Sequence, residues 1–151
     1  MQVQFLHGTE MGNAEFLCED LENSVPEGIS AKCNSMEDVD PTDLNGDTLY
    51  VFVVSTYGAG DVPNTAQPFY EDLQAAKTDL SHVRFAMFGL GDSNFSDTFN
   101  QGSEKVMGLL EECGAKRLGE RGLFDASGPE MPEDIAEPWL QGILEMASQS
   151  T

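Results

Sequence analysis

The chain has 151 residues, and its 27 acidic side chains outnumber its 7 lysines and arginines, which gives a formal net charge of −20. So few cations cannot cover the phosphates of a nucleic acid or an anionic membrane surface, and both are excluded as partners. The length suits one compact domain, expected to span residues 1–151. With no apolar run near the roughly 18 residues of a membrane span and no cleavable leader, we expect a cytoplasmic protein.

Strands and helices are predicted to alternate along the chain. Val3 and Phe5 indicate a first strand, and apolar residues at helical spacing indicate a helix over residues 12–21 with Asn13 as its cap. A weak edge strand is expected at residues 29–33.

The strongest strand prediction is the continuous apolar run at residues 49–54, which is typical of a strand buried on both faces of a parallel sheet. The weaker patterns predict strands at 83–90 and within 116–124, and helices at about 65–77 and 98–113. A final helix begins at Pro132, and Pro138 within its first turns predicts an irregular start.

This alternation implies right-handed crossovers and a doubly wound α/β fold around a five-stranded parallel sheet. In such sheets, ligands bind beyond the carboxyl ends of the strands. Functional residues are therefore expected in the loops after strands one, three, four and five.

The first of these loops spans residues 7–15 and links a strand to a helix. Its glycines allow a tight turn, and Thr9, Asn13 and the free amides at the helix start can donate hydrogen bonds to a phosphate. The loop has neither the lysine of a Walker loop nor the GxGxxG pattern of a dinucleotide fingerprint. His7, beside it, is expected to be structural or half exposed.

The second loop, at residues 55–64, and the third, at residues 89–95, each combine glycines with an aromatic side chain directly after a strand. Tyr57 offers a flat stacking surface, and its neighbouring glycines let the backbone approach a flat molecule closely. Three such loops at one edge favour a planar, phosphorylated ligand.

The cysteines and histidines give no sign of another kind of site. Cys18, Cys33 and Cys113 lie far apart and cannot all pair, so buried or half-buried thiols in a reducing compartment are expected. No cysteine and histidine cluster is present, and no metal is predicted.

The motifs in these loops resemble those of flavodoxin-like FMN domains over nearly the whole chain. They include GTEMGNAE at residues 8–15, STYGAGD at 55–61, GLGD at 89–92 and MPEDIAEPWL at 131–140. The chain is most similar to the short-chain, MioC-type flavodoxins, and it also resembles the FMN modules of cytochrome P450 reductase and sulfite reductase. The resemblance implies the strand order 2-1-3-4-5 and FMN as the cofactor.

By this resemblance, the first loop holds the FMN phosphate and the second and third loops contact the isoalloxazine ring. The residues so assigned to the cofactor are Gly8, Thr9, Glu10, Met11, Gly12, Asn13, Ala14, Ser55, Thr56, Tyr57, Gly58, Ala59, Gly60, Gly89, Leu90, Gly91, Asp92, Asn94, Phe95, Phe99 and Asp125. Met11 departs from the family, which usually has a hydroxyl residue there. Residues 95–100 make the third loop one residue longer than usual.

The resemblance further implies an electron carrier that is not itself an enzyme. The implied electron donor is an NADPH-dependent reductase of the flavodoxin/ferredoxin-NADP reductase type, and the implied electron acceptors are radical-SAM enzymes. The carrier itself is expected to be a monomer. The acidic surface would attract basic partners and keep the complexes weak enough to separate. The alternative is that the net charge of −20 serves only solubility or tolerance of high salt.

Three other functions stay open. A response-regulator receiver shares the fold, but it needs aspartates after strands one and three, where this chain has His7-Gly8 and Ser55-Thr56. A small flavin reductase would need a substrate pocket above the ring. A flavodoxin-like interaction or regulatory protein that lost FMN is the third, and Met11 is the residue that favours it.

Overall fold

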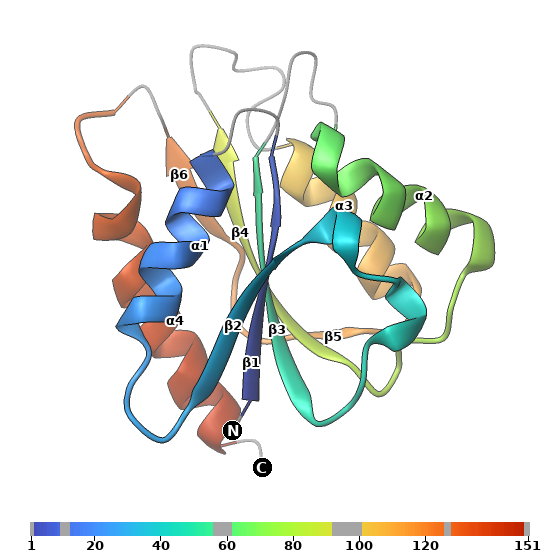
Figure 1. The fold of residues 1–151 in the computed structure, drawn as a ribbon, viewed down its shortest axis with the longest axis horizontal. Helices are drawn as coiled ribbons and strands as arrows, with labels where there is room; N and C mark the ends of the chain where they lie inside the picture. Colours follow the sequence, from blue (N-terminus) through green and yellow to red (C-terminus); the bar gives the residue numbers. More distant parts are fainter. Residues whose placement is uncertain (1, 10–12, 56–61, 92–100, 126–127, 150–151) are drawn as a thin grey trace.

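The computed structural model describes residues 2–9, 13–55, 62–91, 101–125 and 128–149 (Figure 1). Its strands are β1 Gln2–Gly8, β2 Ser30–Ser35, β3 Thr48–Ser55, β4 Arg84–Gly91, β5 Lys116–Arg117 and β6 Gly122–Asp125. Its helices are α1 Asn13–Ser24, α2 Gln67–Ala76, α3 Gln101–Glu112 and α4 Pro132–Gln149, with short 3-10 helices η1 Met36–Asp38, η2 Pro41–Asp43 and η3 Asn64–Ala66.

The strands form one parallel sheet in the order β2-β1-β3-β4-β5, and β6 also pairs with β4. The predicted doubly wound fold and strand order are confirmed. The edge differs in one respect, because the single strand predicted within residues 116–124 is divided into β5 and β6. Gly119 lies between them with φ of +68°, a left-handed conformation that a strand cannot continue through.

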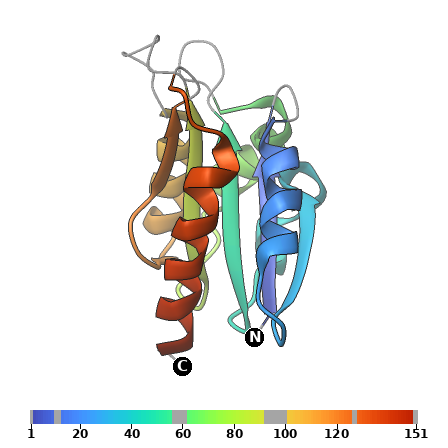
Figure 2. The same ribbon diagram turned by 90° about the vertical axis from the view of Figure 1, so that its left-hand side faces the viewer.

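Two helices cover each face of the sheet. Figures 1 and 2 show α1 and α4 side by side on one face, and Figure 1 shows α2 and α3 on the other. Alternate residues of β3 face the two layers: Val51 and Val53 pack with α1 and α4, whereas Phe52 and Val54 pack with α2 and α3. The prediction that this strand is buried on both faces is confirmed.

The helix boundaries agree with the sequence except at a few ends. α1 includes Asn13 and continues to Ser24, whose hydroxyl donates to the Leu21 carbonyl at 2.9 Å. The predicted start of the helix at residues 98–113 lies outside the described residues, which show α3 from Gln101. α4 begins at Pro132 as predicted and stays continuous through Pro138, so the expected irregular start is not observed.

The parallel register places four strand ends at one edge, the top of the sheet in Figure 1. Gly8 at the end of β1 lies opposite Val54, and Ser55 lies opposite Leu90. Gly91 in turn lies opposite Asp125 at the end of β6. The edge predicted to bind the ligand is thus formed by β1, β3, β4 and β6.

None of the helices in the described ranges combines the length and the apolarity needed to cross a bilayer. All three cysteines are free thiols, with Cys18 buried and the other two half buried, as predicted.

Candidate functional site

The structure brings one part of the predicted site together and does not describe the rest. Gly8, Ser55, Gly89, Leu90, Gly91 and Asp125 lie on neighbouring strands at the carboxyl edge, Thr9 directly follows β1, and Asn13 and Ala14 begin α1. The other predicted residues lie outside the described ranges: Glu10, Met11, Gly12, Thr56, Tyr57, Gly58, Ala59, Gly60, Asp92, Asn94, Phe95 and Phe99.

Gly8 ends β1 at a point where the backbone meets η3 directly. A Cβ on Gly8 would lie 2.7 Å from the Cβ of Ala66 and 3.1 Å from the sulfur of Met36. The first contact is far shorter than two carbon atoms allow, and the Ala66 Cβ cannot turn away. The sequence predicted a glycine for a tight turn, and the structure adds close packing against η3 as a second reason for it.

Thr65, which the sequence analysis did not single out, fixes the backbone of Thr9. The Thr9 amide donates to the Thr65 hydroxyl at 2.8 Å, and that hydroxyl lies 3.1 Å from the Thr9 carbonyl, to which it donates in turn. The Thr65 amide also donates to the same carbonyl at 3.4 Å. The Thr9 amide is thus paired with Thr65, and the start of the first loop is held to η3.

Ser55 ties the second strand end to the first. Its hydroxyl donates to the Gly8 carbonyl at 3.3 Å, which links the end of β3 to the end of β1. The hydroxyl therefore positions the edge of the sheet in this structure. The predicted acidic wall, Asp125, is half buried at the end of β6 next to Gly91.

His7 is buried, with only 7% of its surface exposed, and its Nδ1 has no hydrogen-bond partner. Of the two expected roles, structural or half exposed, this burial agrees with the structural one. Burial lowers the pKa of His7 below 6.5, and the carboxylates of Glu15, Glu19, Asp38 and Glu37 oppose that shift. The imidazole is neutral at pH 7.

Charge is distributed unevenly around this edge. α1 carries Glu15, Glu19, Asp20 and Glu22, and α4 carries Glu133, Asp134, Glu137 and Glu145. Neither helix contains a lysine or arginine. Phe16 on α1 is 66% exposed among these acids. The α1 and α4 layer thus presents an acidic outer surface with one exposed aromatic ring.

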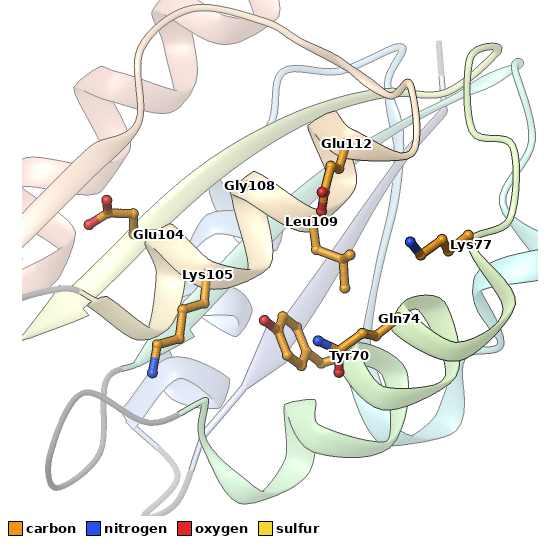
Figure 3. Close-up of a pocket in the computed structure, with 8 residues that line it drawn as sticks. All are labelled: Tyr70, Gln74, Lys77, Glu104, Lys105, Gly108, Leu109 and Glu112. Atoms are coloured by element: carbon orange, nitrogen blue, oxygen red, sulfur yellow. The ribbon is translucent and has the colours of Figure 1, made fainter.

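A groove on the opposite helix layer has a different character. It lies between α2 and α3, has a volume of about 540 Å³, and is lined by Tyr70, Gln74, Lys77, Glu104, Lys105, Gly108, Leu109 and Glu112. Figure 3 shows the Tyr70 ring extending from α2 toward α3. The lining combines two lysines with two glutamates, so its formal charge balances, and none of these residues was predicted to bind the cofactor.

The start of α1 at the carboxyl edge offers backbone amides to an anionic ligand. Within the described ranges, no group of three or more histidine, cysteine or acidic side chains is placed to hold a metal ion. At the carboxyl edge, by contrast, α1 begins beside the end of β1, and the first turn of a helix offers unpaired backbone amides to a phosphate. The buried His7 Nδ1 at the same edge lacks a partner.

The sequence profile of the flavodoxin family, described as "Flavodoxin", matches residues 6–139. Protein MioC of Escherichia coli K12 is 35% identical over 139 residues, which cover 91% of this chain and 92% of that protein. The sulfite reductase [NADPH] flavoprotein alpha-component of Bacillus subtilis is 34% identical over 95% of this chain, but the match covers 23% of its own length.

Solved structures agree with these sequence comparisons. A cysteine-to-serine variant of flavodoxin from Pseudomonas aeruginosa superposes with a TM-score of 0.84 at 28% identity. The match covers 97% of this chain and 98% of that one. The likeness therefore extends over the whole sheet and both helix layers.

Proposed function

The chain belongs to the flavodoxin family, and from that premise we propose that it carries single electrons from an NADPH-dependent reductase to acceptor enzymes. FMN is the cofactor of this family, and it supplies the redox chemistry when bound. Proteins of the family act as electron carriers rather than catalysts, although some relatives are domains of reductases. The flavodoxin resemblance and the FMN prediction are confirmed at the level of the family.

The observation that carries the proposal is the fixed start of the first loop. Thr65 holds both the amide and the carbonyl of Thr9, and Ser55 holds the carbonyl of Gly8. A backbone fixed in this way needs little reordering when a phosphate binds, which favours affinity. The amides at the start of α1 are then the donors that we assign to the phosphate.

Acidic groups near the edge support a carrier that works at low potential. Asp125 lies half buried at the end of β6, opposite Gly91 of β4. A carboxylate at this edge makes the addition of negative charge to a neighbouring ligand less favourable. Asp125 would therefore favour donation of electrons over their retention.

The acidic helices support the choice of partners. An outer surface on α1 and α4 that contains eight acids and no cation attracts a basic protein at long range and releases it as salt rises. The match to an NADPH-dependent flavoprotein supports a reductase as the donor. Radical-SAM acceptors stay a prediction from the resemblance, as do a cytoplasmic location, a monomer and one domain over residues 1–151.

The absorption spectrum of the purified protein tests this function. Flavin bands that disappear from the protein on heating, with FMN in the supernatant, are expected. The protein should then be reduced by NADPH when a flavodoxin reductase is added. A colourless protein that takes up no FMN would contradict the proposal and favour an interaction protein that lost its cofactor.

A pair of glycine variants provides the control. Gly12→Val should abolish FMN binding, because a branched side chain at that position blocks the approach of the backbone to the phosphate. Gly108→Val, on α3, should leave FMN binding unchanged, because a Cβ there meets no atom within 4 Å. Equal FMN binding by both variants would mean that the phosphate loop has been assigned wrongly.

A further inference from the structure

His7 lies at the carboxyl end of β1 and faces α1. Val3 and Phe5 of the same strand pack against Ala14 and Leu17 of α1, and side chains two residues apart share a face of a strand. The ring is 7% exposed, and Nδ1 has no hydrogen-bond partner. A buried nitrogen without a partner is unusual, because such an atom loses its bonds to water without replacement.

Carboxylates surround this ring from two elements. Glu15 and Glu19 lie on successive turns of α1, and Glu37 and Asp38 belong to η1, which follows β2. All four favour a protonated imidazole, but burial outweighs them and lowers the pKa of His7. Burial thus favours the neutral ring and the four carboxylates favour the protonated one, so a further negative charge near the strand end would act in the same direction as the carboxylates.

We propose that His7 takes up a proton from solvent when the phosphate of FMN binds at the start of α1. The inference rests on the proposed function, because it needs FMN at that edge. The phosphate would bring up to two negative charges to the strand end where His7 lies. An added negative charge stabilises the imidazolium, so cofactor binding and proton uptake favour each other.

The pH dependence of this coupling has a definite sign. Binding of FMN raises the pKa of His7 above its value in the FMN-free protein. The additional affinity is therefore fully present below the FMN-free pKa and is lost as pH rises through the FMN-bound pKa. Protonation of the phosphate itself, with a pKa of about 6, weakens binding in acid and acts equally on every variant.

Nuclear magnetic resonance can test the coupling directly, because the chain has 2 histidines. His82 is exposed near the opposite edge of the sheet, with Nε2 3.1 Å from the Leu44 carbonyl, and serves as the internal control. The variants His7→Gln and His82→Gln assign the two ring signals. On addition of FMN, the pKa of His7 should rise, whereas the ring signals of His82 should stay in place.

Riboflavin, which lacks the phosphate, separates the two halves of the cofactor. It should leave the His7 titration unchanged at a concentration that saturates the site. An equal rise with riboflavin would overturn the proposal, because the ring system rather than the phosphate would then be responsible. Identical His7 titrations in the FMN-free and FMN-bound protein would overturn it as well.

Affinity gives a second readout. Between about pH 8 and about pH 5, the Kd for FMN of the unmodified protein should tighten up to about tenfold relative to that of His7→Gln, measured by quenching of flavin fluorescence. The His82→Gln protein should follow the unmodified one. Parallel profiles for all three proteins would refute the coupling while FMN still binds, whereas no binding by any of them would refute the proposed function as well.

Discussion

The two helix layers that enclose the sheet differ in what they contribute to the carboxyl edge. The layer of α1 and α4 carries eight acids and no cation, and α1 begins where the phosphate is assigned. On the other face, η3 carries the contacts that fix the first strand end, through Thr65 and Ala66. One layer supplies the electric field of the site, and the other holds its backbone in place.

Groups that hold a backbone act over a few ångströms and should respond to changes in shape, whereas charges act over a Debye length and should respond to salt and pH. Substitutions in the two layers should therefore give different signatures in the same assays. If a shape change near η3 and a charge change on α1 altered the same measured quantities, the two layers would not have separate roles.

The largest effect is expected from Gly8→Ala. Its new Cβ would lie 2.7 Å from the Cβ of Ala66, so β1 and η3 must separate, and overpacking of this kind costs roughly 1–3 kcal/mol. We expect a lower Tm and FMN binding at least tenfold weaker, measured by thermal unfolding and fluorescence titration.

A second substitution checks the cause. In the double variant Gly8→Ala with Ala66→Gly, the opposing Cβ is absent, and much of the FMN affinity should return. Gly122→Ala is the matched variant on the other face, where the new Cβ would overlap a ring carbon of Phe88. It should lower Tm with a smaller effect on FMN. Equal losses of FMN binding in both single variants would contradict the division between the layers.

The sequence predicted the sheet well because its signals are local. The run at residues 49–54 contains only residues that favour a buried strand, and β3 is indeed buried on both faces. The break between β5 and β6 could not be predicted in the same way. It depends on the left-handed backbone of Gly119, and at that point a Cβ would lie 2.8 Å from the Cδ1 of Ile143 in α4.

The sequence predicted where the site lies but not which side chains hold its backbone. Gly8 and Ser55 are the first residues of recognisable loop motifs, so their place at the edge follows from the order of the strands. Thr65 contacts Thr9 across 56 residues of sequence, and no local pattern indicates that contact. The sequence left open whether His7 is structural or half exposed for a similar reason, since its burial depends on how α1 covers the strand end.

Thr65→Val should have the next largest effect. Valine keeps the shape of threonine but removes the hydroxyl that bonds both the amide and the carbonyl of Thr9, and each lost hydrogen bond costs about 0.5–1.5 kcal/mol. Thr65→Ser keeps the hydroxyl and is the control. We expect weaker FMN binding for the valine variant at every ionic strength. A loss that disappears in high salt would show that the contact acts through charge.

Charge variants on the two layers should change the rate of electron transfer in low salt and leave FMN binding nearly unchanged. Replacing Glu19 and Asp20 of α1 by amides should slow electron transfer from a basic reductase severalfold in low salt, measured by stopped flow. The matched pair Glu104 and Glu112 of α3 should matter less, because Lys105 lies on the same helix. The Kd for FMN should barely change in either. Equal slowing by both pairs would mean that only the total charge matters.

The smallest effect concerns the FMN-free protein, and it follows from the lowered pKa of His7. Burial holds that pKa below 6.5 in the folded state, so at slightly acidic pH the unfolded chain binds more protons than the folded one. Stability is therefore unaffected well above pH 6.5, begins to decline as pH falls below that value, and has lost the full contribution once pH is below the folded pKa. His7→Gln cannot titrate at this position, so its denaturant midpoint should fall less over this pH window, whereas His82→Gln should follow the unmodified protein.

With FMN present the pKa of His7 is expected to rise, and the difference between His7→Gln and the unmodified protein should shrink. If the difference were the same with and without FMN, the carboxylates of α1 and η1 alone would set the protonation of His7, and the proposed link between His7 and the phosphate would be refuted.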